Sequence, residues 1–331
     1  MMPQPRLANR LYAFLDAASD WNAAGETLAE AGVGVCLLLG PNRLHEAARQ
    51  ALKRATRGQV VKTLRSEQVA AAVASRLAAA DIPHVQLKGS TLASTWHGGW
   101  STPAARVWGD VDLLVREDAI SQVVTALRDL GATAGPRSHF EMTVPLRGDV
   151  AVDLHWRLLN DADLDKRFGL GTDEIMTEHV LWKGSTGALK AEALLVHAVL
   201  HGIMSDLSKP STLLDIDGVL RRAELDWQRL GVLARRHRLG LPLTVGIQAA
   251  KTWLGSPVPD GALDELHPQS PWRWSVGLGL KRDPASHLRS GWSGGELFRH
   301  TRDSDAASFV SLARSIPEQL RVQRRLRNAD G

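Results

Sequence analysis

Two aspartates two positions apart, Asp110 and Asp112, are the residues of this sequence best placed to do chemistry. They lie in segment 107–115 (VWGDVDLLV), whose apolar residues predict a β-strand. Side chains alternate along a strand, so both carboxylates are expected on the same face. Neighbouring carboxylates repel each other unless a cation lies between them, and Mg²⁺ is a hard ion that prefers oxygen ligands. The pair therefore predicts a metal site, and a solvated strand face is the alternative.

A Gly-Ser turn upstream of this strand predicts an anion-binding site. Gly89 and Ser90 lie between an expected strand and an expected helix, where backbone N–H groups point at an anion and glycine permits close approach. Lys88 is expected either to reach a phosphate oxygen or to be a solvated lysine. Arg106, four residues before Asp110, either clamps a phosphate oxygen with its planar guanidinium or lies on the surface.

A second expected strand, 150–156 (VAVDLHW), carries a third acid. Asp153 and His155 alternate with Val152 and Leu154, so the two polar side chains share one face. A Gly-Ser pair, an Asp-x-Asp strand and a later strand aspartate, in this order, resemble the nucleotidyltransferases of the DNA polymerase β superfamily.

The sequence is more narrowly similar to the bacterial uncharacterised nucleotidyltransferase family, over residues of about 60 to 255. The similarity is carried by both strand motifs, by Leu87-Lys88-Gly89 and Arg106, and by the later motifs Leu194–His197, His201 and Leu214–Asp217. It implies an α/β (α+β) fold, in which a polymerase β-type core with a mixed sheet is joined to a helical bundle. It also implies transfer of a nucleotide from an NTP.

Nucleotidyl transfer requires an activated acceptor hydroxyl and a triphosphate held in line, and two carboxylate-bridged metal ions can supply both. We expect Asp110 and Asp112 to bridge two Mg²⁺ ions, with Mn²⁺ as a substitute. Asp153 is expected to complete the ion that activates the acceptor. These three aspartates are therefore the predicted catalytic and metal-binding residues.

Four histidines are candidates for substrate binding. His155 is expected to contact a phosphate or the acceptor, or else to be buried in support of the acids. His139, at the start of an expected hairpin, is expected to face the cleft. His197 and His201 have the spacing of paired zinc ligands on a helix, but no third ligand is nearby in the sequence. We interpret them as a packed, hydrogen-bonded pair, with substrate binding at the lobe interface as the alternative.

Three regions are expected to position these residues. Residues 1–80 read as an N-terminal helical region, residues 81–160 as the nucleotidyltransferase core, and residues 161–331 as a C-terminal helical domain. Within 82–157 the patterns predict strand, helix, strand, helix, strand, strand, with the second helix running from Asp118 to Leu130 and the last two strands forming a hairpin.

Other patterns predict the elements outside this order. Residues 90–97 are the first helix of the core, and a loop over 98–105 is expected to cover the nucleotide. From about residue 160 onward the pattern is helical, with helices expected over 189–207, 212–222, 226–238, 241–254 and 311–327.

Composition limits where the protein works and what it binds. The formal net charge of +4 suits a polyanionic ligand but is small for a nucleic-acid binder. Cys36 is the only cysteine, which fits a reducing cytoplasm. The longest apolar run, 33–39, is too short to cross a bilayer, so no membrane partner is expected.

We therefore expect a cytoplasmic, Mg²⁺-dependent nucleotidyltransferase that moves an NMP from an NTP to a hydroxyl or phosphate of a small molecule or peptide. One alternative is an RNA-modifying, toxin-type enzyme, which the modest charge does not favour. The other is a non-catalytic, nucleotide-binding scaffold.

Overall fold

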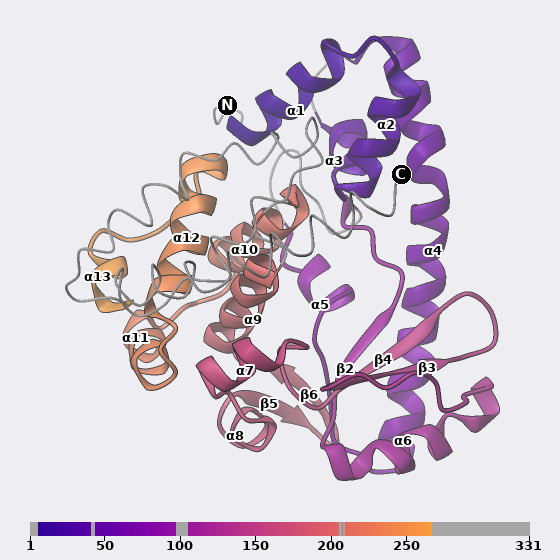
Figure 1. The fold of residues 1–331 in the computed structure, drawn as a ribbon, viewed down its shortest axis with the longest axis vertical. Helices are drawn as coiled ribbons and strands as arrows, with labels where there is room; N and C mark the ends of the chain where they lie inside the picture. Colours follow the sequence, from indigo (N-terminus) through magenta and orange to yellow (C-terminus); the bar gives the residue numbers. More distant parts are fainter. Residues whose placement is uncertain (1–5, 41–43, 97–104, 205–206, 208, 267–331) are drawn as a thin grey trace, which may run out of the picture.

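The computed structural model describes residues 6–40, 44–96, 105–204, 207 and 209–266 (Figure 1). The loop predicted over 98–105, apart from Ala105, and the helix predicted over 311–327 lie outside these residues.

A six-stranded mixed sheet lies at the centre of the fold. Its strand order is β3-β4-β2-β1-β6-β5. Strands β2 and β4 run parallel, as do β1 and β6, and the other neighbours are antiparallel. The strands are β1 (His84–Gln86), β2 (Val111–Leu114), β3 (Glu141–Pro145), β4 (Ala151–His155), β5 (Val180–Lys183) and β6 (Thr186–Leu189).

The predicted order of the core is confirmed as β1, α5, β2, α6, β3, β4. Helix α5 (Ser90–Ala93) is shorter than the predicted helix over 90–97. The predicted helix from Asp118 to Leu130 is divided into η2 (Glu117–Ala119), α6 (Ile120–Ala126) and η3 (Arg128–Leu130). Gly131 closes it with a left-handed φ of 87°, as a C-terminal glycine does.

The sheet also contains a hairpin that the sequence patterns missed. Residues beyond 160 were expected to be helical, but β5 and β6 form an antiparallel pair, and β6 extends the sheet beside β1. Gly184, with φ of 62°, makes the turn between them. Leu181 and Trp182 of β5 are exposed, so this edge strand lacks the alternation of a half-buried strand.

Apolar side chains pack on both faces of the sheet. On one face, residues such as Val111, Leu113, Val152 and Leu154 pack with α4 (Glu46–Ala79) and α6. On the other face, Val85, Leu87 and Leu114 belong to a core formed with the N-terminal and C-terminal helices. Since Asp112 alternates with Leu113, it faces the second core.

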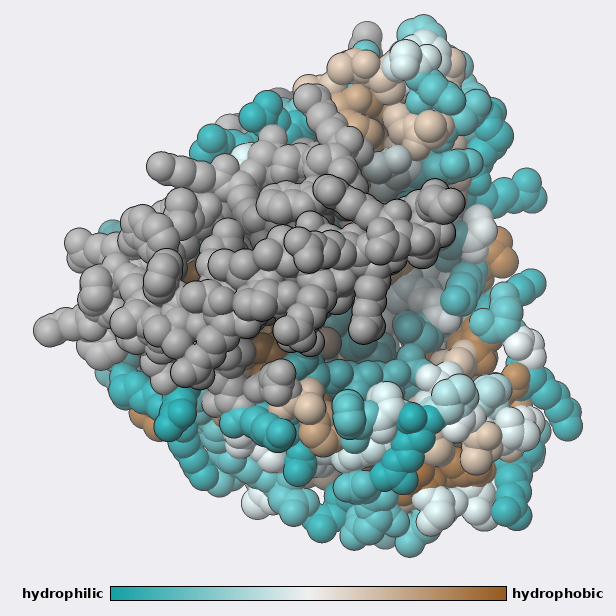
Figure 2. Space-filling view, in the orientation of Figure 1, coloured by the Kyte–Doolittle hydropathy of each residue, from teal (hydrophilic) through white to brown (hydrophobic). Residues whose placement is uncertain are grey.

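Helices from both ends of the chain contribute to the second core. The N-terminal region is helical as predicted, with α1 (Arg6–Asp16), α2 (Trp21–Glu30) and α3 (Gly34–Leu39) lying beside the upper half of α4 in Figure 1. Figure 2 shows tan and brown surface gathered near these helices, and a mixture of teal, white and brown surface over the sheet and α4.

The C-terminal helices correspond to four of the predicted segments. They are α9 (Ala191–Met204), α10 (Pro210–Arg222), α11 (Trp227–Arg236) and α12 (Gly240–Leu254), and shorter helices are α7 (Ala162–Phe168), α8 (Thr172–Glu178) and α13 (Ala262–Leu266). Helix α9 is apolar on almost every side because it is buried among α10, α12 and the sheet. Among the described residues, no helix is long and apolar enough to cross a membrane.

Candidate active site

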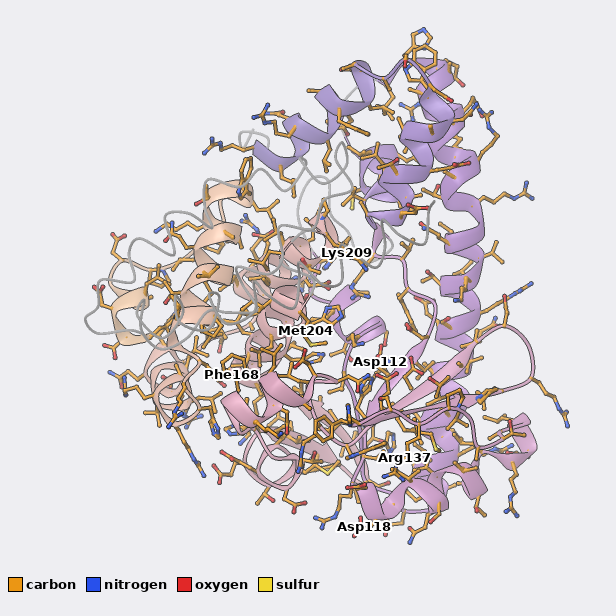
Figure 3. The ribbon with its side chains drawn as sticks, in the orientation of Figure 1. Asp112, Asp118, Arg137, Phe168, Met204 and Lys209 are labelled. Carbon is orange, nitrogen blue, oxygen red and sulfur yellow. The ribbon has the colours of Figure 1, made fainter. Side chains whose placement is uncertain are left out.

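Two of the predicted acids meet on neighbouring parallel strands. Asp112 of β2 and Asp153 of β4 are direct partners in the strand register. Both face the second core, which the sheet forms with the N-terminal and C-terminal helices. Asp112 is only 3% exposed. Asp110 lies just before β2 and is exposed, and the hydroxyl of Thr143 donates a hydrogen bond of 2.8 Å to Asp153 Oδ1. Figure 3 shows Asp112 between α5 and the strands, at the centre of the molecule.

The charges of the three aspartates influence one another. Although Asp110 is exposed, partial desolvation raises its pKa, and the carboxylates of Asp112 and Asp153 raise it further, partly offset by Lys88 and Lys62. Burial alone would raise the pKa of Asp112 as well, but Lys88 and His155 hold it well below its usual range. Asp112 is therefore ionised, and a cation bound beside Asp110 would relieve a real repulsion.

Lys88 supplies the cation closest to these acids. Its Nζ lies 2.5 Å from Asp112 Oδ1. Burial would lower the pKa of Lys88, but Asp112 outweighs burial and raises it, so the amine is an ammonium. Gly89 follows with φ of 60°, and a Cβ there would lie 2.8 Å from the Trp108 ring, so the turn requires glycine. Ser90 begins α5.

Arg106 forms an ion pair that joins the core to the helical bundle. Its Nε donates to Asp215 Oδ1 at 2.7 Å and its Nη2 to Oδ2 at 3.0 Å. Trp96 Nε1 also donates to Asp215, at 2.8 Å, and Arg106 Nη1 donates to the Gly89 carbonyl at 3.4 Å. Arg106 thus holds the Gly89 turn against α10, and its predicted contact with a nucleotide phosphate stays a prediction.

The four predicted histidines are not all in one place. His155 Nε2 lies 3.0 Å from Asp112 Oδ1, so His155 belongs to the acidic site. His139 is exposed, and its ring lies 6.3 Å from that of Phe140 rather than among the acids.

His197 and His201 lie on the part of α9 that faces the site. Burial lowers the pKa of His197 well below its usual value and that of His201 to about 4, and the charges of Lys88 and Asp112 act on both. The predicted hydrogen-bonded pair is wrong for His197, because neither of its ring nitrogens has a hydrogen-bond partner among the described residues. The two rings lie 6.3 Å apart. Both imidazoles are therefore neutral at pH 7.

Sequence reasoning missed several polar residues beside the acids. Glu141 pairs with His155 across the β3–β4 hairpin, as Thr143 pairs with Asp153. Asn160 Nδ2 donates to Glu141 Oε2 at 2.7 Å. The signal was available, because alternation along the predicted hairpin places Glu141 and Thr143 on the face of Asp153.

The donor set of the three aspartates fits a hard divalent cation. Asp110, Asp112 and Asp153 offer carboxylate oxygens, and the charges of Asp112 and Asp153 add to desolvation in raising the pKa of Asp110. In the described structure, their ligand atoms do not form a tight cluster within 4.8 Å of one another, and the Lys88 ammonium lies against Asp112.

A tighter group of metal-ligand atoms lies elsewhere. Within the described part of the chain, Glu174, Glu178 and His179 have ligand atoms within 4.8 Å of one another. Arg236 lies 3.2 Å from Glu174 and 3.1 Å from Glu178, and His237 Nε2 lies 2.8 Å from Glu174. These basic groups balance the acids, so we interpret the group as a contact between α8 and α11.

Comparison with known proteins gives one family. The model of a family described as an uncharacterised nucleotidyltransferase matches residues 10–255. No curated protein and no solved structure matched the chain. The match begins in α1 and ends just after α12, so it covers the complete sheet and most of the described helices. The chain therefore belongs to this uncharacterised nucleotidyltransferase family.

Proposed function

We propose that the protein is a Mg²⁺-dependent enzyme that moves an NMP from an NTP, with ATP the first to be tested, to a hydroxyl or phosphate of a small molecule or peptide. The observation that carries this proposal is the register of β2 and β4, which puts Asp112 beside Asp153. Membership of a nucleotidyltransferase family supports the same class of reaction.

The three aspartates are the proposed metal ligands. Asp110 and Asp112 would hold two ions, Asp153 would complete one of them, and Mn²⁺ would replace Mg²⁺. Bound divalent ions supply Lewis acidity, which favours ionisation of the attacking hydroxyl and neutralises charge on the triphosphate. Thr143 fixes the carboxylate of Asp153 through its hydrogen bond.

The residues around Gly89 would bind the triphosphate. The Lys88 ammonium lies against Asp112 on one side of the acids, and the backbone N–H groups at Gly89 and Ser90 are the proposed donors to the phosphates. Arg106 holds this turn in place and is the fourth predicted phosphate contact. The acceptor oxygen attacks the α-phosphorus, the bond from that phosphorus to the bridging oxygen breaks, pyrophosphate leaves with the electron pair, and the hydroxyl proton passes to solvent.

The acceptor would lie on the face of the sheet that carries Asp112 and Asp153. His155, His197 and His201 border this region, and their substrate contacts remain part of the proposal, as does that of the more distant His139. RNA is a disfavoured acceptor because the net charge of +4 is small for a chain of this length.

We propose a cytoplasmic location because Cys36 is the only cysteine.

The test uses NTPs labelled with ³²P and an extract of cell metabolites. Label in the α position should appear in a new product, whereas label in the γ position should be released in pyrophosphate, and EDTA should stop both. Release of γ-labelled orthophosphate without α-label transfer would mean hydrolysis instead. If the protein binds NTPs but turns none of them over, the non-catalytic, nucleotide-binding scaffold is favoured instead.

A further inference from the structure

The site has a basic end and an acidic end. From β1 across the sheet, its side chains follow in the order Lys88, Asp112, Asp153 and Glu141, because the strand order is β1, β2, β4, β3. The Lys88 end suits a triphosphate. The other end, on the edge strand β3, presents the carboxylate of Glu141, which is not among the proposed metal ligands.

Glu141 is fixed in position but still accessible. Its Oε2 accepts a hydrogen bond of 2.7 Å from Asn160 and lies 3.6 Å from His155 Nδ1, and its side chain is 22% exposed. That His155 nitrogen is buried and has no hydrogen-bond partner among the described residues. Asn160 in turn accepts from Ser138 at 2.9 Å. A carboxylate held in this way retains lone pairs for a donor on a ligand.

The surroundings of Glu141 disfavour a second anion. The groups that act electrostatically on Glu141 are His155, the carboxylates of Asp153 and Asp112, and the Lys88 ammonium at the opposite end of the site. His155 and Lys88 both already lie against Asp112. Arg157, at the rim, stacks over the Phe140 ring and lies 3.5 Å from Asp165, so its charge is already balanced. A phosphate group placed here would meet carboxylates without a dedicated cation.

We propose, on the basis of the proposed function, that Glu141 binds the acceptor and that the reacting group of the acceptor is a hydroxyl rather than a phosphate. The hydroxyl donates a hydrogen bond to Glu141, which orients its oxygen toward the α-phosphorus beside Asp153. The new bond joins that oxygen to the α-phosphorus while the bond from this phosphorus to the bridging oxygen breaks. Pyrophosphate leaves with the electron pair, and the hydroxyl proton passes to solvent. The product is therefore a phosphodiester, whereas a phosphate acceptor would give a phosphoanhydride.

The linkage in the product tests the class of acceptor. The protein is incubated with each of the four α-³²P-labelled NTPs, Mg²⁺ and a metabolite extract. The labelled product is purified, and its linkage is identified by ³¹P NMR on a scaled-up sample. A phosphodiester supports the proposal. A phosphoanhydride overturns it and leaves nucleotidyl transfer intact, whereas no labelled product from any of the four NTPs overturns both.

Substitution tests Glu141 itself, with the purified acceptor as substrate. Glu141→Gln should raise KM for the acceptor by about tenfold or more, as expected for loss of a hydrogen bond to a charged group. KM for the NTP and the NTP-induced rise in Tm should not change. Glu141→Asp should restore part of the loss, and Glu117→Gln, an exposed acid paired with Arg137, is the matched control.

Two results would contradict the role of Glu141. One is a Glu141→Gln enzyme with the same KM for the acceptor as the Glu117→Gln control. The other is an equal loss of NTP binding and acceptor binding, which indicates damage to the whole site. If Glu141→Gln does not fold by circular dichroism, Glu141→Asp decides alone: an unchanged KM for the acceptor overturns the proposal.

Discussion

The closest contact in the site is between a lysine and an aspartate. Lys88 and Asp112 form a buried ion pair in which each partner keeps the other charged. The pair lies where the proposed metal ions would also need Asp112. Lys88 therefore has two roles in this account, since it compensates the carboxylate and contributes to the basic end that suits a triphosphate.

Replacement of Lys88 by Met should destabilise the protein at neutral pH. The cost should be roughly 2–3 kcal/mol, below the 3–5 kcal/mol of a fully buried pair, since 21% of the Lys88 side chain is exposed. The pKa of Asp112 is lower in the folded protein than in the unfolded chain. Its contribution to the free energy of unfolding is therefore complete above the pKa of the unfolded chain, and it is lost only as the pH falls toward the pKa of the folded protein.

Urea denaturation measures this loss, with exposed Lys183→Met as the control. Mg²⁺ should raise the Tm of Lys88→Met more than that of the unmodified protein, since a cation would replace the missing charge. If Lys88→Met is as stable as the control and Mg²⁺ does not raise its Tm, the Lys88–Asp112 pair does not stabilise the fold and no cation replaces the lysine.

A second residue-scale prediction concerns acid stability. The pKa of His201 is lowered to about 4 in the folded protein, mainly by burial, so the unfolded chain binds more protons between about pH 4 and the ordinary value of 6.5. Stability should therefore fall as pH falls through this window. His201 contributes at most about 3.5 kcal/mol to this loss, since one pKa unit corresponds to 1.4 kcal/mol.

His201→Gln should flatten this dependence, whereas exposed His139→Gln should leave it unchanged. Tm measured between pH 7 and pH 4 gives the answer. Parallel curves for His201→Gln and the unmodified protein would show that another group carries the acid sensitivity.

At the scale of elements, one buried ion pair joins the core to the helical bundle. Arg106, just before β2, and Asp215 of α10 are 109 positions apart in the sequence. Trp96 donates to the same carboxylate, and Arg106 also touches the Gly89 turn. The bundle therefore helps to shape the proposed phosphate site from outside the core.

Asp215→Asn should be strongly destabilising although it preserves volume. It leaves the Arg106 charge buried without a carboxylate, which costs roughly 3–5 kcal/mol. The double variant Arg106→Met, Asp215→Leu should lose less than Asp215→Asn in urea denaturation. Asp118→Asn is the control, because that side chain is exposed near α6 (Figure 3). A loss for Asp215→Asn no larger than the control would argue against the contact.

Patterns in the sequence predicted the secondary-structure elements more accurately than they predicted the contacts between side chains. The order from β1 to β4 followed from alternation and turn residues, because each signal is local. The β5–β6 hairpin was missed because β5 is an exposed edge strand with no alternating burial. The pairing of Arg106 with Asp215 joins residues 109 positions apart, so spacing alone did not give it. The contact of Glu141 with His155 follows from the predicted hairpin, but we did not predict a role for Glu141.

At the scale of the whole molecule, the proposed site lies between one face of the sheet and the surrounding helices. The same chain carries a net charge of only +4, and phosphate contacts make nucleic-acid binding steeply salt-dependent. We therefore expect weak tRNA binding that disappears at physiological salt, measured by fluorescence anisotropy over a salt series. Tight binding with a steep salt dependence would promote the RNA-modifying alternative.

The central claim is that the carboxylates on β2 and β4 perform nucleotidyl transfer. The most direct measurement is the rate of α-³²P transfer by Asp112→Asn, compared with Asp118→Asn and the unmodified protein, with folding checked by circular dichroism. We predict that Asp112→Asn loses at least about a thousandfold in rate, since a metal ligand is removed, and that Asp118→Asn is unaffected. A folded Asp112→Asn protein that transfers label at the unmodified rate would contradict the account.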